Sequence, residues 1–236
     1  MAAATISDKE RLLAKNFLLQ HLPPEVLRQI GAYARIVRYD ANSVIFHKDD
    51  AGESMMAVVR GRIKVSCFSA DGRELVFSIL KAGDILGEIA LLDGEPRTAD
   101  AVALEDCDLL VLERRYLLPF LEAHPDVCLD LLRLLCRRLR CTSEQFEDCL
   151  FLEPQMQLAR CLMRLAEVFG KPARDGVLID LKLSQRQIGG LIGRSRESVN
   201  RQLQQFQSSG LITMTEGYIT ISDKDSLKLL AHQQQG

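Results

Sequence analysis

The sequence predicts an α+β protein in three parts: an N-terminal β jelly-roll or barrel, one long helix, and a C-terminal helix-turn-helix that ends in a β-hairpin. Three observations favour this. Short apolar runs separated by glycine-containing turns fill residues 43–112, an uninterrupted amphipathic pattern covers 126–152, and two short helical patterns meet at a glycine at residue 193. Regularly spaced short strands are typical of a β-sandwich or barrel. At 236 residues the chain is long enough to form two hydrophobic cores.

The N-terminal region is expected to begin with helices and to continue as strands. After an initial helical stretch, Pro23-Pro24 begins a second helix over Glu25–Ala34, since proline suits a first helical turn. The apolar runs that follow are too short, between glycines, to be buried helices. Asp71-Gly72 lies between two of them and predicts a two-residue hairpin turn. The predicted strands are Ser43–Phe46, Met55–Val59, Ile63–Phe68, Leu75–Leu80, Ala101–Val102 and Leu109–Leu112.

The long helix is expected to run from Asp126 to Leu152, beginning just after Pro125. Its apolar positions alternate spacings of four and three, which is typical of a coiled-coil seam. A stripe this narrow and long exceeds what packing on one small domain requires, so it predicts a parallel homodimer. One helix that bridges two domains of a monomer is the alternative. The seam positions are Leu132, Cys136, Leu139, Ser143, Phe146 and Leu150.

The C-terminal part is predicted to begin after Glu153-Pro154, because proline breaks the helical pattern there. Ser184 precedes one helix, Gly193 lets two helices turn, and Glu216-Gly217 joins two β-prone segments. Helix, glycine turn, helix and hairpin together predict a winged helix-turn-helix. The expected elements are a helix Gln155–Phe169, a polar loop Gly170–Gly176, a helix from Ser184 through Leu191, a helix Ser195–Gln207, and strands Leu211–Thr215 and Tyr218–Ile221. The predicted domains are residues 1–125, 126–152 and 153–236.

The distribution of charge favours contact with nucleic acid in the C-terminal part. Residues 1–152 carry 19 Lys/Arg against 24 Asp/Glu, whereas 153–236 carry 11 against 8, so a net charge of −2 conceals an asymmetry. Between residues 182 and 201, five basic side chains accompany one acidic side chain, Glu197. A local positive face on a nearly neutral chain is what contact with phosphate requires.

Composition argues against several other classes of protein. There is no run of 18 apolar residues and no apolar N-terminal segment, so we expect a cytoplasmic protein that does not bind a membrane. Seven cysteines, an odd number without a Cys-x-x-Cys pair, are expected to be reduced and structural. The four histidines occur singly, without metal-ligand spacing, so we expect neither a metal site nor catalytic residues.

The segment Gly87–Ala99, GEIALLDGEPRTA, combines a carboxylate, a glycine-containing turn and an arginine nine residues after the carboxylate. Small residues in the turn let backbone N–H groups approach an anion, and Arg97 supplies planar, always-charged donors for phosphate oxygens. Glu88 is an acceptor for a ribose hydroxyl. The segment therefore predicts a binding site for a sugar phosphate. Taken singly, each of the two charged residues would more ordinarily lie on a solvated surface.

The second helix of the predicted helix-turn-helix carries polar side chains on its exposed N-terminal side. Arginine suits the O6 and N7 atoms of guanine, and glutamate accepts a hydrogen bond from N4 of cytosine. This face is therefore expected to read base edges as well as phosphates. An ordinary amphipathic surface helix is the alternative. The side chains on this face are Arg196, Glu197, Asn200 and Arg201.

Two motifs resemble a known family. GEIALLDGEPRTA resembles the phosphate-binding cassette of cyclic-nucleotide-binding domains, and GRSRESVNR resembles the recognition helix of the cyclic AMP receptor protein/FNR family, in the branch with R-E-x-x-x-R. The resemblance extends from about residue 15 to about residue 225. It implies a homodimeric transcriptional regulator that cAMP or cGMP activates for binding a TGTGA-type DNA palindrome, with RNA polymerase as a further partner. Ligand is expected to extend the long helix near Phe146–Leu152 and to set the recognition helices one DNA turn apart.

The resemblance also assigns site residues. A T-S-E triplet at the family's position implies that Thr142 and Ser143 contact the nucleobase, one from each subunit, although a polar seam residue such as Ser143 can instead fix register. The implied ligand residues are Gly87, Glu88, Ile89, Ala90, Arg97, Thr98, Ser78, Thr142 and Ser143. The implied DNA-binding residues are Arg196, Glu197 and Arg201 at base-reading positions, and Ser184, Gln185, Ser195 and Ser198 at phosphates. Asn200, on the same face of the second helix, is also expected to bind DNA.

The sequence leaves alternatives open for the identity of the ligand and for the functional class. The hydroxyl of Thr98, beside Arg97, can also bond the guanine amino group, as in cyclic GMP-responsive channels, so cGMP is a possible ligand. Thr142-Ser143 favours the adenine of cAMP instead. A cyclic-nucleotide-regulated enzyme subunit is an alternative of another class, as is a haem or redox sensor. The first lacks a nucleophile–base pair and the second a ligand pattern, and the helix-turn-helix argues against the enzyme class.

Overall fold

The computed structural model describes residues 22–232. They form two compact units, one comprising residues up to Cys67 together with Phe77–Leu139, the other Phe68–Val76 together with the chain from Arg140 onward. The helical stretch expected before Pro23 lies outside the described residues. Within 22–232, no helix is long and apolar enough to cross a membrane.

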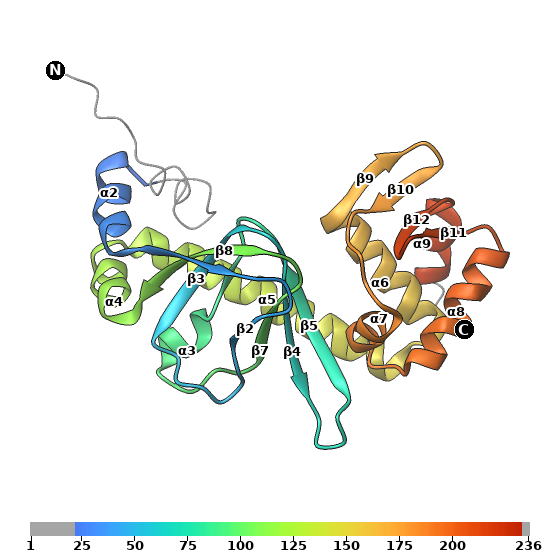
Figure 1. The fold of residues 1–236 in the computed structure, drawn as a ribbon, viewed down its shortest axis with the longest axis horizontal. Helices are drawn as coiled ribbons and strands as arrows, with labels where there is room; N and C mark the ends of the chain where they lie inside the picture. The colour runs from blue at the N-terminus through green and yellow to red at the C-terminus, as the bar shows by residue number, and fades with distance from the viewer. Residues whose placement is uncertain (1–21, 233–236) are drawn as a thin grey trace. The chain divides into compact units, whose positions relative to one another are not determined.

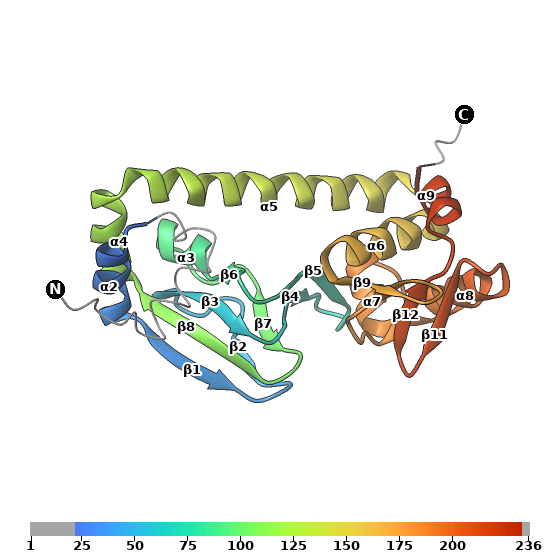
Figure 2. The ribbon, with the colours of Figure 1, turned by 90° about the horizontal axis from the view of Figure 1, so that it is seen from above.

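The strands β1 to β8 form two four-stranded antiparallel sheets, with the orders β1-β8-β3-β6 and β2-β7-β4-β5 (Figure 1). The helix α2 (Pro24–Tyr33) lies beside α4 (Arg114–Ala123) in both ribbon views (Figures 1 and 2). A third short helix, α3 (Glu88–Asp93), follows β6 directly. The strands are β1 (Arg35–Tyr39), β2 (Val44–Phe46), β3 (Ser54–Arg60), β4 (Ile63–Phe68), β5 (Glu74–Leu80), β6 (Ile85–Leu86), β7 (Asp100–Ala103) and β8 (Cys107–Glu113).

The core of the first unit has two parts because β8 is covered on both faces. Leu109 and Val111 belong to an apolar cluster between the two sheets, whereas Leu110 and Leu112 belong to a second cluster with residues of α2 and α4. Successive side chains of a strand point to opposite faces, so a strand buried on both sides is apolar throughout. The run Leu109–Leu112 therefore lacks the polar alternation of a surface strand.

Several local predictions for the region up to α4 require correction. Ser69 N–H donates to Arg73 O at 2.9 Å, so a three-residue loop, Ala70–Gly72, closes the hairpin in place of the predicted two-residue turn. Gly72 has φ +77°, as the last position of such a loop requires. The sequence reading also missed β1, whose exposed arginines conceal its partial burial, and it missed β6 and α4.

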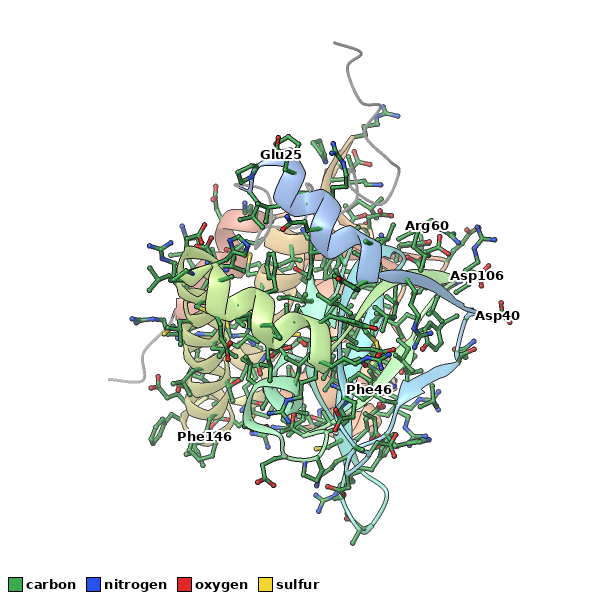
Figure 3. The ribbon with its side chains drawn as sticks, turned by 90° about the vertical axis from the view of Figure 1, so that its left-hand side faces the viewer. Glu25, Asp40, Phe46, Arg60, Asp106 and Phe146 are labelled. Carbon is green, nitrogen blue, oxygen red and sulfur yellow. The ribbon has the colours of Figure 1, made fainter. Side chains whose placement is uncertain are left out.

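The long helix α5 (Pro125–Phe151) has 27 residues and was predicted to within one residue at each end. The positions of its expected seam, apolar except for Ser143, are exposed. Leu132 is 55% exposed, Leu139 67% and Leu150 60%, and Phe146, labelled in Figure 3, is 65% exposed.

The second unit contains the predicted helix-turn-helix and hairpin. Buried side chains of α7 and α8, among them Ile188, Val199 and Leu203, hold the two helices together. Glu216 and Gly217 both have positive φ, which confirms the two-residue turn between β11 and β12. The elements are α6 (Pro154–Phe169), β9 (Gly170–Ala173), β10 (Gly176–Ile179), α7 (Gln185–Ile192), α8 (Arg196–Ser208), β11 (Ile212–Thr215), β12 (Tyr218–Ile221) and α9 (Lys224–His232).

The structure of this unit differs from the prediction in two features. The predicted polar loop Gly170–Gly176 contains β9, which pairs with β10 in a four-stranded sheet of order β11-β12-β10-β9. All four residues of β9 are exposed, so no apolar alternation marks it in the sequence. The final helix α9, which packs on α6, was also not predicted.

Candidate functional site

The segment Gly87–Ala99 folds as a glycine, one short helix and a loop that returns to the start of that helix. Gly87 is the N-cap of α3 and has φ +81°. A Cβ at this position would lie 2.9 Å from Ser54 O and nearer still to Arg97 Nη1. Only glycine permits both this backbone conformation and this close approach. Gly87 therefore lets the arginine come against the helix N-terminus.

Arg97 is part of the framework of this site, since only 3% of its surface is exposed. Its Nη1 donates to Gly87 O at 2.9 Å, and its Nη2 donates to Ser54 O at 2.7 Å and to Ser54 Oγ at 3.2 Å. The guanidinium carbon lies 4.5 Å from the ring centroid of Phe46, a cation–π contact. These contacts fix the guanidinium before any ligand binds.

Two opposing effects act on the positive charge of Arg97: burial disfavours it and nearby carboxylates favour it. Burial lowers the pKa of Arg97 from its ordinary value, while the carboxylates of Glu88, Asp50 and Glu53 act in the opposite direction. An arginine in a protein nonetheless remains protonated. The site thus holds a cation stripped of water, which a phosphate can pair with strongly.

Glu88 is the second buried charge of the site, at 1% exposed. Arg138 of α5 donates from Nη1 to Glu88 Oε1 and from Nη2 to Ile85 O. Sequence reasoning missed Arg138, whose partner lies 50 residues away along the chain. The available signal was its position four residues, one helical turn, before Thr142.

Two buried polar atoms of the site have no hydrogen-bond partner within the described residues: Glu88 Oε2, an acceptor, and Arg97 Nε, a donor. Unpaired buried polar groups carry a desolvation penalty of about 1–3 kcal/mol. Orphaned groups of this kind are expected where a ligand supplies the missing partners. A hydroxyl for Glu88 and an anionic oxygen for Arg97 are what a ribose phosphate offers, so the residues present fit that ligand.

The other expected ligand residues lie in varied environments. Ala90 is buried at 2% and packs where a Cβ on Gly52 would collide with it, whereas Ile89 is 39% exposed. Thr98 is exposed, and Ser78 is half-buried on β5. Thr142 and Ser143 are exposed on α5.

Two of the three expected phosphate-contacting serines, Ser184 and Ser195, serve as helix caps, whereas Ser198 lies within α8. Ser184 Oγ accepts from Gln187 N–H at 3.2 Å while Ser184 N–H donates to Gln187 Oε1 at 2.8 Å, a capping box for α7. Ser195 Oγ accepts from Ser198 N–H at 3.3 Å and caps α8. Capped helix N-termini present their remaining N–H groups to anions, which keeps both ends suitable for DNA phosphates.

Some polar side chains on the face of α8 are exposed, and one is hydrogen-bonded to α7. Arg196, Glu197 and Arg201 are exposed, whereas Gln185 Nε2 donates to Asn200 Oδ1 at 2.8 Å and ties α7 to α8. Hydrogen bonds from its own backbone N–H and from Ser195, with the charge of Arg196, lower the pKa of Glu197. Glu197 is therefore an ionised acceptor at neutral pH.

Comparison with known proteins identifies two domains in the chain, one for each of the two sites. The model of the cyclic nucleotide-binding domain matches residues 36–124, and that of the Crp-like helix-turn-helix domain matches residues 157–230. A CRP-like cAMP-activated global transcriptional regulator of Mycobacterium tuberculosis is 28% identical over 218 residues, 92% of this chain and 97% of that protein. The cyclic AMP receptor protein of Thermus thermophilus is 28% identical over 214 residues, 91% of this chain and 96% of that protein.

Solved structures show the same fold. FixK2 from Bradyrhizobium japonicum superposes with a TM-score of 0.76 at 20% identity, over 86% of this chain and 99% of that chain. Fold and sites together define a transcriptional regulator that binds a cyclic nucleotide and DNA. The chain belongs to the cyclic AMP receptor protein/FNR family.

Proposed function

We propose that the chain is a homodimeric regulator that cAMP activates for binding a TGTGA-type DNA palindrome. The observation that carries this is the pair of orphaned buried atoms, Glu88 Oε2 and Arg97 Nε, in a site whose guanidinium is already held by backbone oxygens. Arg97 and the N–H groups that follow Gly87 take the cyclic phosphate. Glu88 takes the ribose hydroxyl, with Arg138 keeping its carboxylate in place.

The adenine base is proposed to meet Thr142 of one protomer and Ser143 of the other. Two relatives that cover more than nine-tenths of the chain are named for cAMP, which supports this ligand. The exposed hydroxyl of Thr98 favours cGMP as the second candidate, since it lies beside the phosphate-binding arginine.

The dimer is proposed to form along α5. Leu132, Leu139 and Phe146 are each more than half exposed on one seam, and a partner helix would remove this apolar surface from water. A monomer bridged by α5 remains the alternative. We propose domain limits of 1–125, 126–152 and 153–236. Along the chain, the division between the two compact units falls within α5, between Leu139 and Arg140. RNA polymerase is the proposed partner at promoters.

Ligand is proposed to extend α5 near Phe146–Leu152 and to place the two recognition helices one DNA turn apart. Arg196, Glu197 and Arg201 then read bases. Free energy for this shift comes from the difference in ligand affinity between the two arrangements of α5.

Two measurements on the full chain test the proposal. Titration calorimetry with cAMP and cGMP is expected to show tighter binding of cAMP, at one site per protomer. A gel shift with a duplex carrying two inverted TGTGA half-sites is expected to show higher affinity with cAMP than without it, and no such gain for a scrambled duplex. Absence of binding by either nucleotide contradicts the proposal, and tighter binding of cGMP selects the second candidate.

A further inference from the structure

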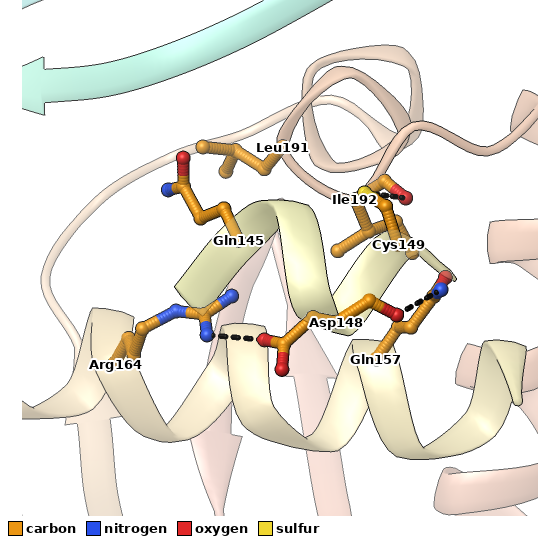
Figure 4. A pocket seen from close by; sticks show the side chains of 7 residues that line it. All are labelled: Gln145, Asp148, Cys149, Gln157, Arg164, Leu191 and Ile192. Atoms are coloured by element: carbon orange, nitrogen blue, oxygen red, sulfur yellow. Dashed lines mark hydrogen bonds and ion pairs between the residues drawn. The ribbon is translucent and has the colours of Figure 1, made fainter. Parts of the chain in front are cut away.

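Four of the five buried polar or charged side chains among residues 22–232 fall into two groups. Glu88 and Arg97 belong to the nucleotide site. Asp148, at 4% exposed, and Gln157, at 2%, lie together where α5 meets α6, beside a small pocket (Figure 4). Burying polar groups costs free energy unless they are well paired, so this second group needs a physical explanation.

Gln157 uses its amide to join three segments of the chain. Its Nε2 donates to Asp148 O at 2.7 Å and to Leu152 O at 3.0 Å, and its Oε1 accepts from Arg194 Nε at 2.8 Å. The last carbonyl groups of a helix lack partners within the helix. Gln157, in the first turn of α6, therefore supplies donors to the end of α5 while it holds Arg194.

Arg194 stands at the turn of the helix-turn-helix. Its N–H donates to Gly189 O at 2.9 Å, and the next residue, Ser195, is the N-cap of α8. The position of Arg194 is thus linked to the point where the recognition helix begins. A side chain that holds Arg194 has a direct mechanical connection to α8.

The carboxylate of Asp148 holds the same end of α5 against other helices. Asp148 Oδ1 accepts from Arg160 Nη1 and Oδ2 accepts from Arg164 Nη1, each at 2.6 Å. Arg160 also donates from Nε to Ala231 O, in α9, at 2.7 Å. The last turns of α5 are thereby tied to α6 and α9. Toward the helix-turn-helix, Cys149 Sγ donates a long contact to Ile192 O of α7 at 3.8 Å, and Gln157 provides the shorter link to Arg194, next to the start of α8.

We propose that Gln157 is a positioning residue that transmits the state of the α5 C-terminus to the recognition helix through Arg194. A register shift of one residue moves a backbone carbonyl by about 1.5 Å along the axis and about 100° around it, and growth of α5 past Phe151 redirects the carbonyl of Leu152. Gln157 then either follows its acceptors and moves Arg194, or loses their hydrogen bonds. The inference deepens the proposed function, because it rests on a ligand-dependent change in α5.

The test uses Gln157→Met, which removes both donors and the acceptor at similar volume, and Arg194→Met, an exposed change that should leave the fold intact. Gln155→Met on the same helix is the matched control. Fluorescence anisotropy gives the Kd of a labelled TGTGA duplex with and without saturating cAMP. The ratio of these two Kd values measures coupling, and any uniform loss of DNA affinity cancels in it.

We expect this ratio to fall about tenfold in Gln157→Met and in Arg194→Met, with no further fall in the double variant, because both changes break one link. Gln155→Met should retain the wild-type ratio. A lowered thermal midpoint with an unchanged ratio overturns the proposal, as do effects that multiply in the double variant.

Hydrogen exchange separates failure of this link from failure of the proposed function. If wild-type protein gains no DNA affinity from cAMP, the proposed function fails and the ratio is uninformative. Exchange of the amides of residues 194–199 then decides the inference. Faster exchange in Gln157→Met than in Gln155→Met supports the link, and equal exchange overturns it.

Discussion

Arg138 of α5 donates a hydrogen bond to the buried carboxylate of Glu88, the first residue of α3. The long helix is therefore in direct contact with the proposed nucleotide site within the first unit. Glu88 leaves its other oxygen unpaired among the described residues. A ligand hydroxyl at that oxygen would bond the same carboxylate that Arg138 of α5 contacts, so we expect α5 to respond to the occupant of the site.

Replacement of Arg97 by leucine is expected to abolish binding of the nucleotide. Hydrogen bonds to charged groups contribute about 1.5–3 kcal/mol each, so the affinity should fall at least about tenfold. Calorimetry measures the loss, and sedimentation should show an intact dimer. Arg60→Leu is the matched control, because Arg60 forms an exposed ion pair with Asp108 on the same unit. Undiminished cAMP-dependent DNA binding in Arg97→Leu would refute the coupling of site and DNA.

Replacement of Arg138 by methionine should lower both stability and affinity for the nucleotide. It leaves the carboxylate of Glu88 buried with one partner fewer, and such losses cost about 1–3 kcal/mol. Urea unfolding measures the free energy and calorimetry the affinity. Arg137→Met, at the exposed neighbouring position, controls for the loss of charge. Equal effects of the two substitutions would argue against a specific role for Arg138.

Thiol labelling tests whether the seam of α5 is covered by a second protomer or exposed to solvent in a monomer. Cys136 and Cys141 are both exposed on α5, but only Cys136 lies on the seam between Leu132 and Leu139. In a parallel dimer the partner helix covers Cys136, so iodoacetamide should alkylate Cys141 several times faster, as mass spectrometry can follow. Leu139→Glu should raise the alkylation rate of Cys136 toward that of Cys141. Equal alkylation rates of the two cysteines in the wild-type protein would favour the monomeric alternative.

Burial raises the pKa of the Cys161 thiol from 9.0 to about 11. Folding thus favours the protonated thiol, and its contribution to stability is complete below pH 9 and is lost as pH rises through about 11. Since the thiolate is the reactive form, alkylation of Cys161 at pH 9 should be slow in native protein and fast in urea. Comparable rates in both states would show that the thiol is not protected.

Arg196→Ala should weaken DNA binding by about 1–3 kcal/mol at one guanine and relax discrimination there. Competition among duplexes substituted at single positions measures this. Arg174→Ala, an exposed arginine between β9 and β10, controls for a general loss of positive charge. Uniform weakening across all duplexes would instead assign Arg196 a phosphate contact.

Local signals predicted much of this fold correctly. Ser184 and Ser195 mark helix starts by hydroxyls that bond the nearby backbone, and the seven-residue pattern of α5 repeats along one helix. Interactions of this kind join residues three or four apart, so they are visible in the order of the residues. The β9 strand was missed because its exposed residues carry no apolar alternation.

The sequence by itself determined α6, α7 and α8 of the second unit, the hairpin after them, and the presence of a carboxylate and an arginine within Gly87–Ala99. Only the tertiary structure decided how these charges are held. It placed Arg97 against Ser54, Arg138 against Glu88, and Gln157 between the end of α5 and Arg194. These partners are 43, 50 and 37 residues apart. Contacts at such separations depend on packing of whole elements, and no local pattern of residue types encodes them.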